Sequence, residues 1–140
     1  MMTEVENENL KKDLVFALMN SSDGLALFQE KFKACSEAFE VGKLPEAAAI
    51  LREVLGPISE FSQFLADVIT SSHEYVSEET FGELTKKCER LESFLNEMLS
   101  EMEGENFLEL GDIMRFDLGD LMKEFDALFP KLADEISASK

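Results

Sequence analysis

Apolar residues recur along this chain at alternating steps of three and four over nearly its whole length. This spacing places them on one face of an α-helix, and no stretch keeps the period of two that marks a strand. The first apolar row has a single gap, at Ser21, and consists of Leu14, Leu18, Leu25, Phe28, Phe32, Cys35 and Phe39. The pattern therefore predicts an all-α protein that begins with a long helical segment.

The polar residues from Asn20 to Gly24 lie inside this first row and are typical of a turn. In one interpretation, a single helix runs from about Glu4 to Val41 and is kinked between Ser22 and Gly24. In the other, a short helix ends near Asn20 and a second begins with Asp23 as its N-cap. Because the apolar phase continues through the segment, we favour the single helix.

The second apolar row follows Gly42, which we expect to end the preceding helix, and Pro45, which suits the first turn of the next one. Its members are Leu44, Ala48, Leu51, Leu55, Ile58, Phe61, Leu65 and Val68. The row keeps its phase across Gly56 and Pro57, although proline removes a backbone donor and strains the preceding turn. We therefore predict one helix that is kinked near Gly56-Pro57.

Two further apolar rows complete the chain. Ser77 is expected to cap the third helix, which Gly104 ends, and its row is Phe81, Leu84, Cys88, Leu91, Leu95, Met98 and Met102. Asn106, with Glu109 three residues later, is expected to form a capping box for the fourth helix. That helix has the row Phe107, Gly111, Met114, Leu118, Leu121, Phe125, Leu128 and Leu132, beside a second row of Leu110, Ile113 and Phe116. Because it is apolar on more than one face, we expect it to be the most buried.

Four long helices joined by short links predict an antiparallel up-down-up-down bundle, formed as one domain over residues 1–140. A chain of this length can bury a core without metals or disulfides, and 45% of its residues are hydrophobic. No apolar stretch approaches the roughly 18 residues of a transmembrane helix. The acidic start, residues 1–9, is unlike a signal peptide. We therefore expect a soluble protein of the reducing bacterial cytoplasm.

The chain has 30 acidic and 13 basic residues, which give a formal net charge of −17. Phosphate backbones and anionic membrane surfaces repel such a chain, so we expect neither nucleic acid nor membrane as a partner. Solubility is the simplest explanation of the charge, and recognition of a basic partner is the alternative.

The sequence does not contain the residue patterns that most kinds of catalytic site require. His73 is the one histidine, whereas a ferritin-like di-iron site needs Glu-x-x-His on two helices. Cys35 and Cys88 lie on apolar rows, away from a base that could activate them. The glycines are scattered singly, so a phosphate-binding loop is absent. We therefore expect no enzymatic activity and no cofactor.

Two acidic pairs form the one pattern that is typical of a metal site, Glu89 with Glu92 and Glu109 with Asp112. Carboxylates three residues apart share a helix face and suit a hard cation. With the sequence Glu-Leu-Gly-Asp at 109–112, the arrangement resembles the all-α nucleotide pyrophosphohydrolases of the MazG type. The resemblance covers residues 89–112 and implies that these four carboxylates hold Mg²⁺.

The chain departs from the MazG pattern in the first pair, where Lys86 and Lys87 stand in place of a further acid. Helix capping by Glu109 and the favourable charge of Asp112 in an early helical turn explain the second pair without a metal.

Four phenylalanines lie one step outside the apolar rows: Phe16, Phe64, Phe94 and Phe116. They either widen the core face of their helices or form an apolar surface for a partner. Adaptable methionines typical of binding grooves are Met19, Met98, Met102, Met114 and Met122. We therefore predict a protein-protein interaction module, an adaptor or chaperone-like bundle that receives an amphipathic helix. The alternatives are a structural homodimer and a Mg²⁺-dependent MazG-like hydrolase.

Overall fold

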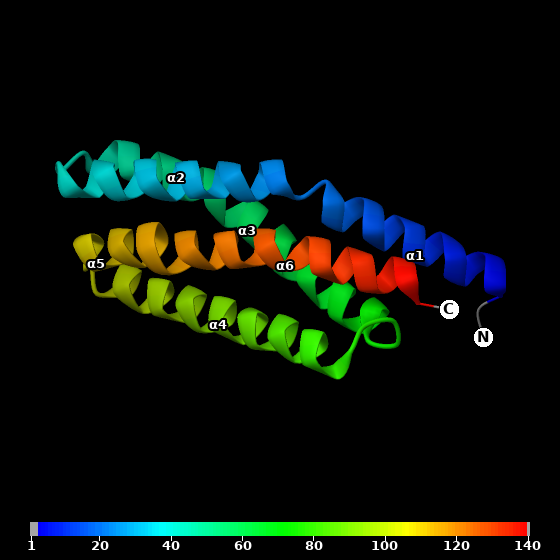
Figure 1. Ribbon diagram of the computed structural model, residues 1–140. Helices are drawn as coiled ribbons and strands as arrows, with labels where there is room; N and C mark the ends of the chain where they lie inside the picture. Colours follow the sequence, from blue (N-terminus) through cyan, green and yellow to red (C-terminus); the bar gives the residue numbers. More distant parts are fainter. Residues whose placement is uncertain (1–2, 140) are drawn as a thin grey trace.

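The computed structural model describes residues 3–139, which fold into an all-α helical bundle (Figure 1). Its elements are α1 (Glu4–Met19), α2 (Ser22–Glu40), α3 (Leu44–Ser72), α4 (Glu78–Glu103), α5 (Phe107–Asp112), the π-helical segment η1 (Ile113–Leu118) and α6 (Gly119–Ala138). The segments α5, η1 and α6 follow one another directly and act as the fourth long helix. The predicted all-α fold is therefore confirmed.

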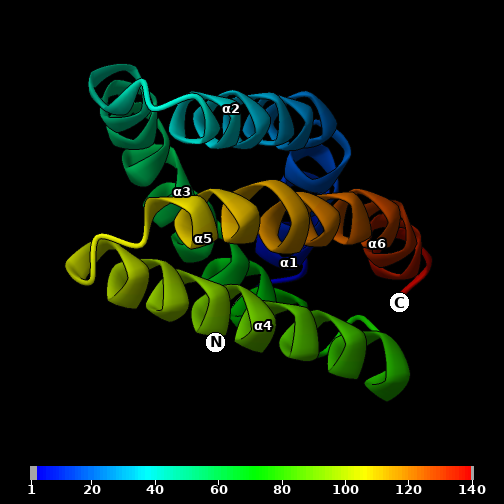
Figure 2. The same cartoon turned by 90° about the vertical axis from the view of Figure 1, so that its left-hand side faces the viewer.

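The fourth helix runs through the middle of the bundle, with α1 and α2 along one edge and α4 along the other (Figure 1). Its side chains Leu118, Leu121 and Phe125 have no exposed surface, so this helix is deeply buried, as its two apolar rows predict. The helix α3 runs obliquely and passes behind α5 and α6 (Figure 2). A regular up-down-up-down arrangement of four aligned helices is therefore not confirmed.

The prediction of a single helix from Glu4 to Val41 is wrong. The helix α1 ends at Met19, and α2 begins at Ser22 with Ser21 rather than Asp23 as its N-cap. The break thus precedes the expected kink between Ser22 and Gly24. At the break the Ser21 hydroxyl donates to the Leu18 carbonyl at 2.7 Å, where a continuing helix would place the Ser22 amide. The Asn20 side chain adds a second bond to the Phe16 carbonyl, which keeps the Asn20 backbone amide as its helical donor.

The helix α3 continues through Gly56 and Pro57, which confirms that this segment is one helix. Both residues are exposed, so the carbonyl of Glu53, which loses its usual amide donor, faces water. The buried face of α3 differs from the predicted row at its edge: Ala47, Leu51, Val54, Ile58, Phe61, Leu65 and Val68 are buried, whereas Ala48 is half-buried and Leu44 and Leu55 are exposed.

Phenylalanine rings fill much of the core, where α3 meets α6. The ring of Phe61 lies edge-on to that of Phe125, with the ring centroids 5.4 Å apart. Phe64 packs edge-on against Phe129 at 6.2 Å. Such pairs add to the stabilisation that burial of the rings provides.

Both ends of α4 show how local sequence sets the helix boundaries. At its start the Ser77 hydroxyl accepts a hydrogen bond from the Thr80 amide, which confirms the predicted cap. At its end Gly104 is the C-cap directly after the last helical residue, Glu103, which agrees with the predicted end. Glu105 follows it in the left-handed region with φ of +56°.

The capping box expected at Asn106 and Glu109 is wrong. The side chain of Asn106 makes no capping hydrogen bond to α5. Its backbone amide instead donates to the Glu101 carbonyl at 2.9 Å, because it belongs to the motif that closes α4.

Within residues 3–139, the helices lack the combination of length and apolar character that crossing a membrane requires.

Candidate functional site: a groove between α3 and α4

An open groove runs between α3 and α4. It consists of two adjoining hollows of about 340 and 420 Å³, which share Ser62 and Leu95. From α3 it is lined by Leu55, Ile58, Ser59, Ser62, Leu65, Ala66 and Ile69. From α4 it is lined by Cys88, Leu91, Glu92, Leu95, Met98, Leu99 and Met102. We call this surface the α3–α4 groove.

The helical repeat explains how the α3–α4 groove is built. Residues 55, 58, 62, 65 and 69 of α3 follow steps of three and four, and so do residues 88, 91, 95, 98 and 102 of α4. From Leu55 to Ile69 the lining is about 21 Å long at the rise of an α-helix. The groove is therefore a continuous channel along both helices rather than an isolated pit.

The floor of the α3–α4 groove is buried and its rims are exposed. Ile58 and Met98 are 3% and 2% exposed, whereas Leu55 and Leu99 on the rims are 39% and 55% exposed. The sequence placed Leu55 and Met102 on apolar rows but did not identify them as lining a groove. The signal it contains is the set of small residues on one face of α3, namely Ser59, Ser62 and Ala66, which leave space beside the core face.

The α4 wall of the groove is acidic. Among the described residues that line the groove, Glu92 alone is charged. Glu89 and Glu103, one and three helical turns from it, are exposed on the same side of α4. On the opposite side of this helix, Arg90 and Lys87 approach Glu124 of α6 at 2.8 and 3.6 Å. These two basic residues of α4 are thus held away from the groove.

Cys88 is a half-buried free thiol in the wall of the groove. Burial, together with the neighbouring Glu89 carboxylate, raises the pKa of the Cys88 thiol to about 11. Burial likewise raises the pKa of Cys35 to about 11, and that thiol is enclosed beside the Ala47 carbonyl at 3.4 Å. Neither thiol is activated as a nucleophile.

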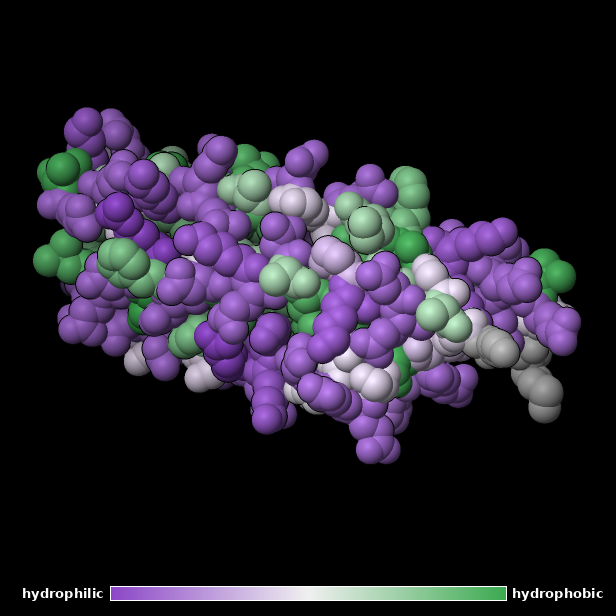
Figure 3. Space-filling view, viewed as in Figure 1, coloured by the Kyte–Doolittle hydropathy of each residue, from purple (hydrophilic) through white to green (hydrophobic). Residues whose placement is uncertain are grey.

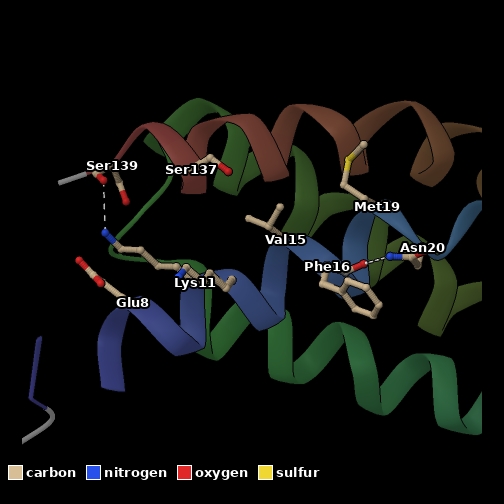
Figure 4. A pocket seen from close by; sticks show the side chains of 9 residues that line it. Glu8, Lys11, Val15, Phe16, Met19, Asn20, Ser137 and Ser139 are labelled. Atoms are coloured by element: carbon tan, nitrogen blue, oxygen red, sulfur yellow. Dashed lines mark hydrogen bonds between the residues drawn. The ribbon is translucent and has the colours of Figure 1, made fainter. Parts of the chain in front are cut away.

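Another hollow, of about 580 Å³ and separate from the α3–α4 groove, lies beside α1 and the end of α6 (Figure 4). It is lined by Glu8, Lys11, Lys12, Val15, Phe16, Met19, Asn20, Ser137 and Ser139. Phe16 and Met19 are 71% and 54% exposed, and Lys11 donates to the Ser139 carbonyl at 3.3 Å. Its charged residues have both signs, so this surface indicates no particular partner chemistry.

The four phenylalanines outside the apolar rows divide between core and surface. Phe64 and Phe94 are half-buried and pack against the core. Phe16 is exposed, and so is Phe116 (54%), beside the guanidinium of Arg115. Of the methionines, Met98 and Met102 line the α3–α4 groove, whereas Met114 and Met122 are fully buried.

The four carboxylates that the resemblance to the MazG type implies as Mg²⁺ ligands are all exposed. Glu92 lines the α3–α4 groove, whereas Glu109 lines a different hollow at the end of the bundle, beside Phe39 and Leu44. Across residues 3–139, no three His, Cys, Asp or Glu side chains form a group that could hold a metal ion. The structure thus does not bring Glu89, Glu92, Glu109 and Asp112 together.

His73, the single histidine, lies at the exposed end of α3 and stacks on the ring of Phe81, with the ring centroids 4.1 Å apart. This packing accounts for its position in the link that leads to α4.

The chain matches no protein-family model, no curated protein and no solved structure. The likeness to the MazG type therefore stays an interpretation of residues 89–112 alone. The face shown in Figure 3 is largely hydrophilic, with small scattered hydrophobic patches.

Proposed function

We propose that this protein is a protein-protein interaction module, and that the α3–α4 groove receives an amphipathic helix of a partner. The observation that supports this function is the mainly apolar lining from Leu55 to Ile69 and from Cys88 to Met102, in which Ser59, Ser62 and Glu92 are the polar members. A channel about 21 Å long matches about four turns of helix. Helix-in-groove recognition uses apolar side chains at the same steps of three and four that line this channel.

The side chains of the groove suit this role. Ser59, Ser62 and Ala66 are small enough for a partner helix to approach α3 closely, as ridges of one helix fit grooves of another. Met98 and Met102 are flexible and adapt to the shape of incoming side chains. Leu55 and Leu99 provide exposed apolar surface that a partner would remove from water.

We also place this function in the cytoplasm. Both cysteines are free thiols in the structure, and a reducing compartment maintains that state.

The test is to fill the groove with a large side chain. Ser62 lines both hollows, so Ser62→Trp occupies the centre of the channel. Ser93 is exposed on α4 outside the groove, so Ser93→Trp is a matched control. Affinity capture with each variant, followed by mass spectrometry, should recover a partner with wild type and Ser93→Trp but not with Ser62→Trp. Equal recovery by Ser62→Trp, in a protein whose circular dichroism is unchanged, would refute the proposal.

A further inference from the structure

We infer that the occupant of the α3–α4 groove is a basic amphipathic helix, with Lys or Arg residues flanking its apolar side chains. This inference rests on the proposed function and adds the chemistry of the partner. It follows from where the charges of α4 lie relative to the apolar channel.

The α4 edge of the groove is negative: it carries three exposed carboxylates and one exposed cation, Lys86, which lies three residues before Glu89. Glu92 lines the channel, and Glu89 and Glu103 lie on the same side of the helix. None of the three makes an ion pair within residues 3–139. The neighbouring basic residues Lys87 and Arg90 are engaged with Glu124 on the side that faces α6.

The α3 edge carries charges of both signs, since Arg52, Glu60 and Asp67 are exposed on this helix. Gln63 donates to Asp67 at 3.2 Å, and Arg52 is exposed one turn before Leu55. The negative charge is thus concentrated on the α4 edge, so we expect the basic residues of the partner helix to lie along that edge.

A partner with long basic side chains fits this arrangement. The stem of Lys or Arg can lie along Leu99 or Leu95 while its charged end reaches the carboxylates of Glu92 and Glu89. Opposite charges at the rim of an apolar contact raise the association rate and select against acidic partners.

A second copy of this chain is a poorer occupant. Two chains that each carry a formal charge of −17 repel one another. In a symmetric dimer both copies use the same surface, so one interface would contain two acidic α4 edges. The charge that opposes self-association attracts a basic segment.

Three synthetic helical peptides test the inference. They share Leu at the positions that enter the groove and differ in the flanking positions, which are Lys in one, Gln in the second and Glu in the third. Calorimetry on the 140-residue chain should show that the Lys peptide binds about tenfold more tightly than the Gln peptide, and the Glu peptide most weakly. Bound Lys peptide should also slow alkylation of Cys88, which locates it in the groove.

Charge removal provides the matched comparison. The double variant Glu89→Gln/Glu92→Gln should bind the Lys peptide about tenfold more weakly than the wild type does, and should bind the Gln peptide with unchanged affinity. Glu30→Gln/Glu37→Gln removes the same charge from exposed positions of α2 and should change binding of the Lys peptide less than twofold.

The outcomes separate the inference from the proposed function. If Lys and Gln peptides bind equally and Ser62→Trp abolishes both, the groove binds helices but the inferred basic partner is wrong. If a concentration-dependent dimer competes with the peptides, the occupant is a second copy and the inference is also wrong. If no peptide binds, or if Ser62→Trp has no effect, the proposed function fails.

Discussion

Gly111 of α5 lies directly against Ser36 of α2. A β-carbon at position 111 would stand 3.2 Å from the Cα of Ser36 and 3.1 Å from its hydroxyl oxygen. Both residues are buried, and a side chain at this point of α5 would require Ser36 to move by a few tenths of an ångström. This contact gives the glycine of the Glu-Leu-Gly-Asp segment a packing role that needs no metal.

Gly111→Ala should therefore destabilise the protein by about 1–3 kcal/mol, because the added methyl group forces α2 and α5 apart. Chemical denaturation followed by circular dichroism measures the change. Gly82→Ala is the control: it lies within α4 with nothing within 4 Å of an added β-carbon, so it should stabilise the protein by up to about 1 kcal/mol. A neutral effect of Gly111→Ala would show that the contact is not close in solution.

The hydroxyl of Ser36 is buried and has no hydrogen-bond partner among the described residues. Ser36→Ala removes this unsatisfied group, and we expect a gain in unfolding free energy of about 1 kcal/mol or more. Ser59→Ala, at an exposed position of α3, changes helix propensity alone and should raise the free energy of unfolding by about 0.5 kcal/mol. An equal gain from both variants would mean that the Ser36 hydroxyl finds a partner in solution.

The ends of α2 and α4 use the same closing motif with different residues. After α2 the left-handed position is Gly42, with φ of +77°, and the Lys43 amide donates to the Ala38 carbonyl at 2.9 Å. After α4 that position is Glu105, with φ of +56°, one residue beyond Gly104. A side chain in this conformation costs about 1 kcal/mol.

Glu105→Gly should consequently stabilise the protein by about 1 kcal/mol, whereas Gly42→Ala should destabilise it by a similar amount. Thermal unfolding of the two variants beside the wild type measures both effects. A loss of stability in Glu105→Gly would contradict the assigned backbone conformation.

The sequence predicted which segments are helical better than it predicted where each helix ends and which helices cover its apolar face. Apolar spacing identified the rows that build α2, α3, α4 and the fourth helix, because that spacing is a property of each helix alone. It offered a helix end near Asn20 only as the alternative to the favoured single helix, because the apolar phase continues past the point where the Ser21 hydroxyl bonds the Leu18 carbonyl and α1 ends. Local spacing records which face is apolar but not such competition for carbonyls.

The α3–α4 groove was not predictable for a related reason. Rows that contain Ile58 and Met98 show that each helix has an apolar face, but whether the two faces close on each other depends on how the helices are placed. The same limit applies to Glu92 and Glu109, whose spacing in the sequence suggested a shared site although they line different hollows. Contacts between helices, not periodicity within them, decide both questions.

Glu135 of α6 supports the start of α4, and this contact should depend on pH. Its carboxylate accepts hydrogen bonds from the Ser77 amide, at 2.7 Å, and from the Thr80 hydroxyl. Burial by itself raises the pKa of Glu135, but these hydrogen bonds outweigh it, so the pKa lies below its ordinary value. The stabilisation is therefore present above the pKa of the unfolded chain and is lost as the pH falls through the folded-state value.

Glu135→Gln should lower the free energy of unfolding by about 1 kcal/mol at pH 7, and by progressively less as the pH falls through the lowered folded-state pKa. Urea denaturation across this pH range measures the difference. Asp134→Asn, at the exposed neighbouring position, should have little effect at any pH in this range. A difference between Glu135→Gln and wild type that does not shrink with acid would mean that the carboxylate charge is not involved.

Cys88 should report on the groove through its reactivity. Because its pKa is raised to about 11, only about one thiol in ten thousand is ionised at pH 7, and the thiolate is the reactive form. The rate of alkylation by iodoacetamide should therefore rise about tenfold per pH unit from pH 7 to 10. Mass spectrometry of the intact protein follows the reaction.

Cys35 is the internal control, because it has no exposed surface and should stay unmodified while the protein is folded. If the alkylation rate of Cys88 levels off by pH 9, its thiol has an ordinary pKa. Cys88 would then be more exposed to solvent than it is in the structure. The two thiols share nearly the same raised pKa, so ionisation does not distinguish them. Faster reaction at Cys88 would therefore be direct evidence that the α3–α4 groove is open to solvent.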